Sequence, residues 1–433
     1  MTMFTRRIVV TGLGAVTPVG NDPSTFWQAL LDGTSGVQSI GSLAARGARP
    51  SYAAEVKDLT PEAAGLPRKR LKMMGRQAQL AYAAVAHASA DAGLLDERAV
   101  DHRRLGVILG VGMLNADVDE LGRAFHAVAD GGSHGPFDMI AFGRLGGPQL
   151  FPLWLLRHIP NLAAAHASIS LDAQGPSNTI ATGCVAGANA IGEAARIIAR
   201  GDADVILAGG TDARTTALAI LRYRELGWLA TREDVPPSAV SAPFDDSATG
   251  FVSGEAAGIV VLESHEHAIR RGARIYAELA AYGAANDAHD VMAPHPEGRG
   301  LAKALSRCLA RGRLAPAAVD AVFAPATSVP SFDRAIASSL RRVFGTGREG
   351  PVITATRSIL GHTHAASSAL DSIAAVKAIQ ASQVPATLNL GSPIADLPFV
   401  RGTTHRAPIS TAMVGAYGFG GHAAALAWRG YQA

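Results

Sequence analysis

The fold is decided by residues 177–190, Ser-Asn-Thr-Ile-Ala-Thr-Gly-Cys-Val-Ala-Gly-Ala-Asn-Ala. β-branched residues up to Thr182 favour a strand, Gly183 breaks it, and small residues at helical spacing continue to Ile198. This pattern predicts a strand, a tight elbow and a buried helix that begins at or next to Cys184. A thiol at the positive end of a helix dipole is expected to have a lowered pKa and to be nucleophilic. The alternative is a buried cysteine that only fills space in the core.

The composition describes a large globular protein. Of the 433 residues, 48% are hydrophobic and 17% are charged, so the chain can bury a sizeable core, as two or more domains or as one large duplicated fold. The net charge is +3, and no basic run is interleaved with aromatic residues, so a nucleic-acid partner is not expected. Cys184 and Cys308 are the only cysteines, which excludes a disulfide framework and favours the cytoplasm.

Neither a signal sequence nor a membrane span is expected. Arg6 and Arg7 precede a short apolar run, which weakly resembles a leader, but glycine and proline interrupt residues 12–20. No apolar run approaches the roughly 18 residues that a membrane helix needs. The protein is therefore expected to be soluble.

Strands alternate with helices along the chain, which predicts a layered α/β fold with a parallel-rich sheet. Besides the strand before Cys184, the expected strands are 7–11, 105–111, 204–208, 258–262, 275–281, 319–324, 352–356, 411–414 and 424–428. The expected helices are 22–31, 73–92, 115–129, 263–271, 300–310, 333–344 and 363–379. The apolar segment 151–161 would line a tunnel, contact another subunit or, most simply, pack in the core.

Two segments are similar in kind. Residues 180–196 and 352–373 each combine a strand, an elbow and a small-residue helix, with Cys184 at one elbow and His362 at the other. Two such halves would share a core and bring the elbows face to face. The expected units are residues 1–271 and 272–433.

Several short motifs occur in this order along the chain: RIVVTGLG (7–14), TPVG (17–20), GPS (175–177), DVILAGGTD (204–212), FD (244–245), GEAAG (254–258), GH (361–362) and YGFGG (417–421). In these motifs and their order the chain resembles the elongating β-ketoacyl-acyl-carrier-protein synthases, including the type II polyketide ketosynthases, over essentially its full length. The resemblance implies a thiolase fold with a duplicated, layered α-β-α-β-α architecture, and a dimer, expected to be a homodimer. It also implies acyl substrates on the phosphopantetheine of an acyl or peptidyl carrier protein, so neither a resident cofactor nor a metal is expected.

The resemblance also assigns roles to residues. Cys184 would take the acyl chain as a thioester, and the backbone N–H groups of Cys184 and Phe419 would form the oxyanion hole. Phe419 would also gate the acyl pocket, and its glycine-rich loop would let backbone donors face a carbonyl. The alternative for this loop is a turn that only closes a final hairpin. The residues expected to contact substrate are Thr327, Ser328, Asp287, Gly418 and Gly420.

The chain departs from the family where decarboxylation is normally carried out. The second family histidine is present as His362, but Pro325 stands in place of the first. Proline has no ionisable group, no side-chain donor and no backbone N–H, so it cannot replace an imidazole. Arg357 stands for the active-site lysine, Ile336 for a glutamate and Val329 for a pantetheine-contacting threonine. Arg357 would bind a carboxylate, clamp an enolate or form a structural salt bridge.

These features favour a ketosynthase-type acyltransferase of polyketide or hybrid natural-product biosynthesis. It would load an acyl chain onto Cys184 and then form a C–C or lactone bond, intramolecularly and without decarboxylation. His362 is the first candidate for the base of that step, while His364 is expected on a helix face and His289 in a solvated loop. One alternative is a conventional decarboxylating synthase in which His364 or a water replaces the missing imidazole. The other is a catalytically silent subunit similar to a chain-length factor.

Overall fold

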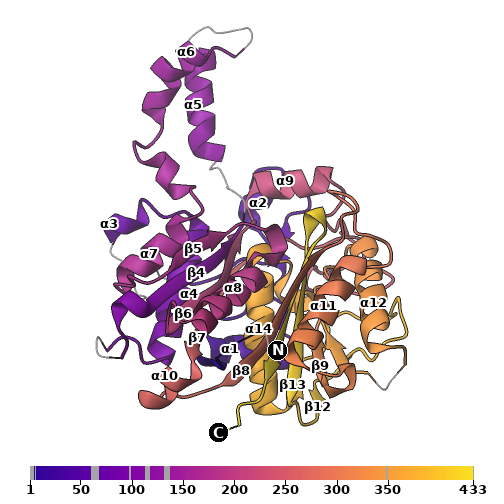
Figure 1. Ribbon diagram of the computed structural model, residues 1–433. Helices are drawn as coiled ribbons and strands as arrows, with labels where there is room; N and C mark the ends of the chain where they lie inside the picture. Colours follow the sequence, from indigo (N-terminus) through magenta and orange to yellow (C-terminus); the bar gives the residue numbers. More distant parts are fainter. Residues whose placement is uncertain are drawn as a thin grey trace.

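The computed structural model describes residues 4, 6–59, 68–96, 99–112, 118–130, 137–347 and 350–432. They form a mixed α/β structure around one ten-stranded sheet, with helices on both of its faces (Figure 1). The strands of this sheet are β1 (Ile8–Val16), β4 (Leu105–Val111), β5 (Ser177–Ile180), β6 (Val205–Ala213), β7 (Glu255–Ser264), β8 (Ala277–Asn286), β9 (Ala321–Phe323), β10 (Val352–Thr354), β13 (Thr411–Tyr417) and β14 (His422–Arg429). Every strand expected from the sequence is present. Several are longer than expected.

The prediction of a parallel-rich sheet is wrong. Parallel pairing is confined to the two ends of the sheet, where β4 pairs with β5 and β6, and β9 pairs with β10 and β13. The five pairings between these ends are antiparallel. Alternation of strands and helices predicts parallel pairing only where a helix crosses over between neighbouring strands, and β13 and β14 are joined by a short turn instead.

The strand order repeats along the chain. The sheet runs β10-β9-β13-β14-β8-β1-β7-β6-β4-β5. Read outward from the centre, starting at β8 on one side and at β1 on the other, each set consists of the first, fifth, fourth, second and third of its five strands in chain order. The two sets meet where β1 pairs with β8 through Val9 with Glu278 and Val10 with Ala277. Helix α8 (Ala186–Arg200) packs on β4 and β6, helix α14 (Ser367–Ala381) packs on β7 and β13, and the two helices contact each other.

The remaining helices are α1 (Pro23–Asp32), α2 (Gly41–Ala45), α3 (Arg68–Leu71), α4 (Arg76–Asp91), α5 (Val118–Asp130), α6 (Met139–Ala141), α7 (Leu162–Ser170), α9 (Ala217–Glu225), α10 (His265–Arg270), α11 (Arg299–Gly312), α12 (Pro330–Phe344) and α13 (Arg357–Leu360). Of these, α1, α4, α5, α10, α11 and α12 correspond to predicted ones within a few residues, whereas α2, α3, α6, α7, α9 and α13 were not predicted. The start of the expected helix 115–129 lies outside the described residues. Helix α1 shows the local chemistry: the Asp22 carboxylate accepts the first backbone N–H groups, and Gly33 ends the helix in the left-handed conformation.

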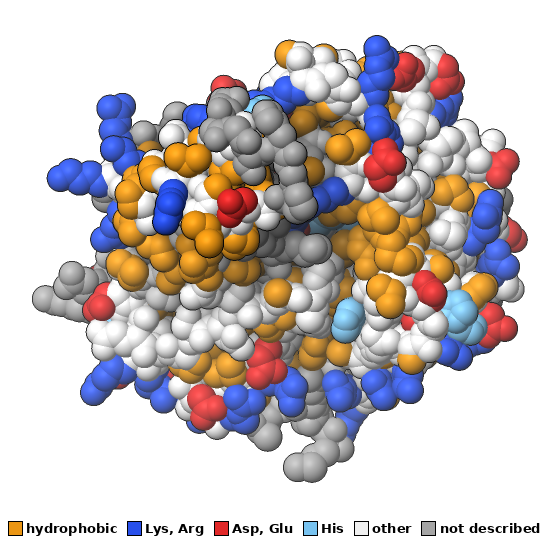
Figure 2. Space-filling model, turned by 90° about the horizontal axis from the view of Figure 1, so that it is seen from above, with side chains coloured by type: hydrophobic (Ala, Val, Ile, Leu, Met, Phe, Trp, Pro, Cys, Tyr) orange, Lys and Arg blue, Asp and Glu red, His pale blue; other side chains and the backbone are white. Residues whose placement is uncertain are grey.

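Helices α5 and α6 project from the body of the molecule (Figure 1). Hydrophobic side chains gather on the face seen from above in Figure 2, and exposed ones on this part of the chain include Met139 and Ile140. The neighbouring segment 151–161 is mostly half-buried or exposed, with Leu153 at 45% and Leu155 at 57%. The expectation that this segment packs in the core is therefore wrong.

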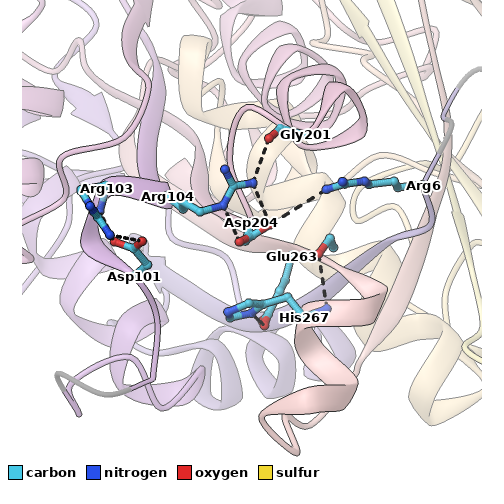
Figure 3. Close-up of polar contacts among 9 residues, drawn as sticks. Arg6, Asp101, Arg103, Arg104, Gly201, Asp204, Glu263 and His267 are labelled. Atoms are coloured by element: carbon cyan, nitrogen blue, oxygen red, sulfur yellow. Dashed lines mark hydrogen bonds and ion pairs between the residues drawn. The ribbon is translucent and has the colours of Figure 1, made fainter.

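Charged groups are paired at the end of the sheet where β6 begins and β7 ends (Figure 3). Arg104 donates to Asp204 at 2.6 Å and to the carbonyl of Gly201 at 2.8 Å, which satisfies the C-terminus of α8. The fully buried carboxylate of Glu263 is bonded to His267 at 2.5 Å and to Arg271 at 2.6 Å. These contacts tie α8, β6, β7 and α10 together.

This pairing predicts a loss of stability in acid. The hydrogen bond from Arg104 holds the pKa of Asp204 below its usual value. Burial alone would raise the pKa of Glu263, but hydrogen bonds from Arg271 and His267 bring it below its usual value. Both carboxylates therefore bind protons more weakly in the folded chain. The stability they contribute is present above the unfolded-state pKa of about 4 and is lost as the pH falls through the folded pKa.

We therefore expect Glu263→Gln to lower the free energy of unfolding by about 2 kcal/mol at pH 7, because it removes charge-assisted hydrogen bonds. The difference from the wild-type chain should shrink only below about pH 4, as the pH falls through the folded pKa of Glu263, which lies below its usual value. Denaturant unfolding at neutral pH and in this acid range measures the difference. An equal loss of unfolding free energy at both pH values would show that Glu263 does not stabilise the fold through its charge.

Candidate active site

The elbow at Cys184 has the predicted form. Strand β5 ends at Ile180, a 3₁₀ turn covers Gly183–Val185, and α8 continues from Ala186. Gly183 has φ +60°, a conformation that glycine adopts without the steric penalty that a side chain would bring. Cys184 is buried at the start of this turn, 6% exposed.

Cys184 and His362 face each other, as predicted. The Sγ of Cys184 lies 3.2 Å from Nε2 of His362, which is itself buried. The His362 backbone is fixed by a hydrogen bond from its N–H to the Val252 carbonyl at 2.7 Å and by one from the Gly254 N–H to its own carbonyl at 2.9 Å. The two elbows approach closely because glycines lie between them: a Cβ at Gly187 or Gly210 would lie 2.7 or 2.2 Å from the Ala365 carbonyl oxygen.

The predicted lowering of the Cys184 pKa is wrong. Burial, reinforced by the negative charge of Asp212, raises the pKa of the Cys184 thiol to about 12. Burial and the charge of Arg357 lower the pKa of His362 well below its usual value. The resting pair is therefore a thiol beside a neutral imidazole. Cys184 becomes nucleophilic when His362 accepts its proton during attack, rather than by carrying a standing negative charge.

A second imidazole lies beside this pair. His364 is 3% exposed, and its ring centre lies 4.2 Å from that of His362. The expectation that it occupies a helix face is wrong, because a 3₁₀ turn, His364–Ala366, precedes α14 and places the residue in the centre of the molecule. His289 is exposed in its loop, as expected. Among the described residues, Cys184, His362 and His364 form a set whose potential metal-ligand atoms lie within 4.8 Å of one another.

Arg357 forms the structural salt bridge that was one of its three alternatives. Its Nη1 donates to Oδ2 of Asp371 at 2.9 Å and to the carbonyl of Ala324 at 3.1 Å. Both side chains are buried, and the Thr356 hydroxyl donates to the second oxygen of Asp371 at 2.5 Å. The pair thus connects α13, α14 and the residue that precedes Pro325.

Asp333 holds the segment that follows Pro325, the residue in place of the family's first histidine. The Asp333 carboxylate accepts the backbone N–H groups of Thr327 and Ser328 at 2.8 and 3.0 Å, and that of Phe244 at 2.8 Å. Burial raises the pKa of Asp333 to about 6. Ser328 is fully buried with φ +75°, and Thr327 is 8% exposed. Their contacts with substrate stay predictions.

Asp287 fixes the loop that follows β8. Its carboxylate accepts the Tyr417 hydroxyl and the N–H groups of His289 at 3.2 Å and His295 at 3.1 Å. The same loop holds the glycine-rich turn, because the Asn286 side chain donates to the Gly420 carbonyl at 2.7 Å. The contact of Asp287 with substrate remains a prediction.

The glycine-rich turn lies against the nucleophile. A Cβ at Gly418 would lie 3.3 Å from that of Cys184. Cys184 and Phe419 both lie in the first part of a short 3₁₀ turn, where backbone N–H groups have no acceptor within the helix. This suits the predicted oxyanion hole. The Phe419 ring stacks on Trp228, with ring centres 3.9 Å apart and planes 11° apart. No sequence motif singled out Trp228.

A buried cysteine at a strand-to-helix elbow, facing an imidazole from the second half of a duplicated sheet, defines a thiolase-fold condensing enzyme. The chain belongs to the beta-ketoacyl synthase family: the N-terminal domain of that family matches residues 5–268, and the C-terminal domain matches residues 276–391. The predicted fold and family are confirmed. The protein is a ketosynthase-type acyltransferase.

Relatives with assigned names support the same family. The chain is 35% identical over 431 residues to 3-oxoacyl-[acyl-carrier-protein] synthase 2 of Synechocystis sp., covering 99% of both chains. It is 35% identical over 421 residues to the protein of the same name from Coxiella burnetii, covering 97% of both.

Solved structures of ketosynthases have the same fold as this chain. A type II polyketide synthase ketosynthase, AntDE, in complex with its acyl-carrier protein AntF, matches with a TM-score of 0.86 and 29% identity, covering 98% of this chain and 100% of that one. The ishigamide ketosynthase/chain length factor matches with a TM-score of 0.85 and 28% identity, covering 99% and 100%. In the described part of the chain, no helix is both long and apolar enough to cross a membrane.

Proposed function

We propose that this ketosynthase transfers an acyl chain from the phosphopantetheine of a carrier protein to Cys184, and then closes a C–C or lactone bond within that chain without decarboxylating a malonyl unit. One observation carries the proposal: Cys184 and His362 remain paired at 3.2 Å, whereas Pro325 occupies the place of the first family histidine. The acyl-transfer pair is intact, and one of the groups that would polarise a malonyl thioester is missing.

The chemistry of loading follows from the geometry. As the Cys184 sulfur attacks the thioester carbonyl, its proton passes to Nε2 of His362. The backbone N–H groups of Cys184 and Phe419 stabilise the negative oxygen of the tetrahedral intermediate. The pantetheine thiolate then leaves and takes the proton from His362, so an acyl-enzyme and a free thiol remain. No metal and no resident cofactor take part in this scheme.

The pairing of Arg357 with Asp371 supports the same proposal. Arginine cannot lose its proton, and here its guanidinium is occupied by a buried carboxylate and by the Ala324 carbonyl. Ile336, at the position of the family glutamate, is buried in an apolar cluster. Neither residue supplies the acid–base chemistry of its family counterpart.

The proposed partner is an acyl or peptidyl carrier protein in the cytoplasm, and the proposed assembly is a homodimer of chains divided at residues 271/272. Strand β5 supports the dimer, because it ends the main sheet with Ser177 and Asn178 exposed and so offers an edge for pairing with a second copy. The repeated strand order supports the division into halves.

The test combines an acyl-pantetheine thioester with malonyl carrier protein. Intact-protein mass spectrometry should show a gain equal to the acyl group on Cys184, and no elongated acyl product should form when malonyl carrier protein is added. Malonyl-dependent elongation would establish the conventional synthase instead.

A further inference from the structure

His364 is a buried titratable side chain that the loading step does not use. It sits two residues after His362, yet its ring is held by different neighbours. It stacks on Tyr223 of α9, with ring centres 5.1 Å apart and planes 13° apart, and meets the edge of Phe251. Its backbone φ of +47° lies in the left-handed region, which is uncommon outside glycine.

His364 does not stand in for the imidazole lost at Pro325. The ring of Pro325 lies against β13, where a Cβ at Gly415 would be 2.9 Å from its Cδ. His364 instead contacts Tyr223, Phe251 and Ser253, all from the part of the chain that precedes β8. The two positions therefore have different surroundings. The imidazole of the first family histidine has not been restored at its original place.

The hydrogen bonds of Ser253 indicate which nitrogen of His364 carries the proton. The Ser253 hydroxyl donates its one proton to the Arg214 carbonyl at 2.7 Å. Its oxygen can therefore only accept at the 3.4 Å contact with Nε2 of His364, so Nε2 carries the hydrogen and Nδ1 keeps a free lone pair. Burial, with the charges of His362, Arg214 and Arg357, lowers the pKa of His364 well below its usual value, so the ring is neutral and able to accept a proton.

His364 also lies within reach of the reacting centre. A ring nitrogen of His364, a ring nitrogen of His362 and the Cys184 sulfur lie within 4.8 Å of one another. An acyl chain bound to that sulfur would have its carbonyl carbon beside both rings. A nucleophilic group of the same chain that folds back onto this carbonyl would therefore come near the His364 ring.

We propose that His364 is the general base of the bond-closing step, a catalytic role that rests on the acyl transfer proposed above. Its Nδ1 removes a proton from an alcohol, or from a carbon next to a carbonyl, within the Cys184-bound chain. The electron pair released forms the new O–C or C–C bond to the thioester carbon, and the C–S bond breaks. The proton then moves from His364 to the Cys184 sulfur, directly or through His362, which restores a thiol and two neutral imidazoles.

The experiment separates loading from closure with one probe, a δ-hydroxyacyl pantetheine thioester, which closes to a lactone without any malonyl unit. Loading is followed as the acyl-enzyme mass, and closure as its decay together with lactone formation, corrected for lactone formed in buffer. For His364→Leu we expect loading within about 2-fold of wild type and closure slowed by about 100-fold or more, in the range of general-base removal. His289→Leu, which changes an exposed histidine, is the matched control and should leave both rates unchanged.

Different results separate the two ideas. If the wild-type chain forms no acyl-enzyme, the proposed function itself fails. If it does, and His364→Leu closes the ring at the wild-type rate, only the role of His364 is overturned. His364→Gln, which keeps a polar group at the site, should show the same split between the two rates. Equal alkylation of Cys184 by iodoacetamide in wild type and both variants shows that the site is intact.

Discussion

Replacing Cys184 with serine should abolish the acyl-enzyme and lower turnover by on the order of 10⁴-fold, as expected when the nucleophile of a covalent mechanism is removed. A serine hydroxyl holds its proton more tightly than a thiol does and is a weaker nucleophile at the same position, even with His362 beside it. Intact-protein mass spectrometry with an acyl-pantetheine thioester measures the loss directly.

The control for this substitution is Cys308→Ala. Cys308 is fully buried, packs among apolar side chains, and has its pKa raised by burial. Its replacement should leave acylation unchanged. If the wild-type chain resisted both the thioester and iodoacetamide at neutral pH, Cys184 would not be a working nucleophile, and the silent-subunit alternative would replace the enzyme.

Replacing Asp371 with alanine should lower the free energy of unfolding by about 3–5 kcal/mol, because it leaves the buried guanidinium of Arg357 without its counter-charge. Arg357 is 3% exposed, so water does not compensate for the lost carboxylate. The same substitution frees the arginine that donates to the Ala324 carbonyl, so we expect the segment that carries Pro325 to lose order as well. Denaturant unfolding gives the first quantity.

The double variant Arg357→Met with Asp371→Leu is the control. It removes both charges together, and replacement of a buried ion pair by apolar side chains is often close to neutral. We expect it to recover most of the stability lost in Asp371→Ala. A loss below about 1 kcal/mol in Asp371→Ala would mean that the pair contributes little and that Arg357 is free for another role.

Local signals in the sequence predicted the framework of the site correctly. The change from β-branched residues to Gly183 and then to small residues located the elbow, and the Gly-His dipeptide located His362. Both signals act within a few residues of the side chain they position. The strand directions could not be found in this way, because the return of β14 beside β13 depends on a turn and not on the pattern within either strand.

Properties that depend on packing between distant parts of the chain could not be predicted from the sequence. The helix position of Cys184 indicated a lowered pKa, but burial outweighs it, and burial is decided by the second half of the chain. His364 was expected on a helix face because the 3₁₀ turn before α14 has no sequence signature of its own. The stacking of Trp228 on Phe419 joins two segments with no local pattern in common.

Acyl transfer without decarboxylation of malonate is the property on which the proposed function depends. The most direct measurement is release of labelled CO₂ from malonyl carrier protein, labelled in its free carboxyl group, after Cys184 has been acylated and the adduct confirmed by mass. We expect release no faster than in a sample without enzyme. Release of CO₂ in step with formation of an elongated acyl chain would contradict the proposed function.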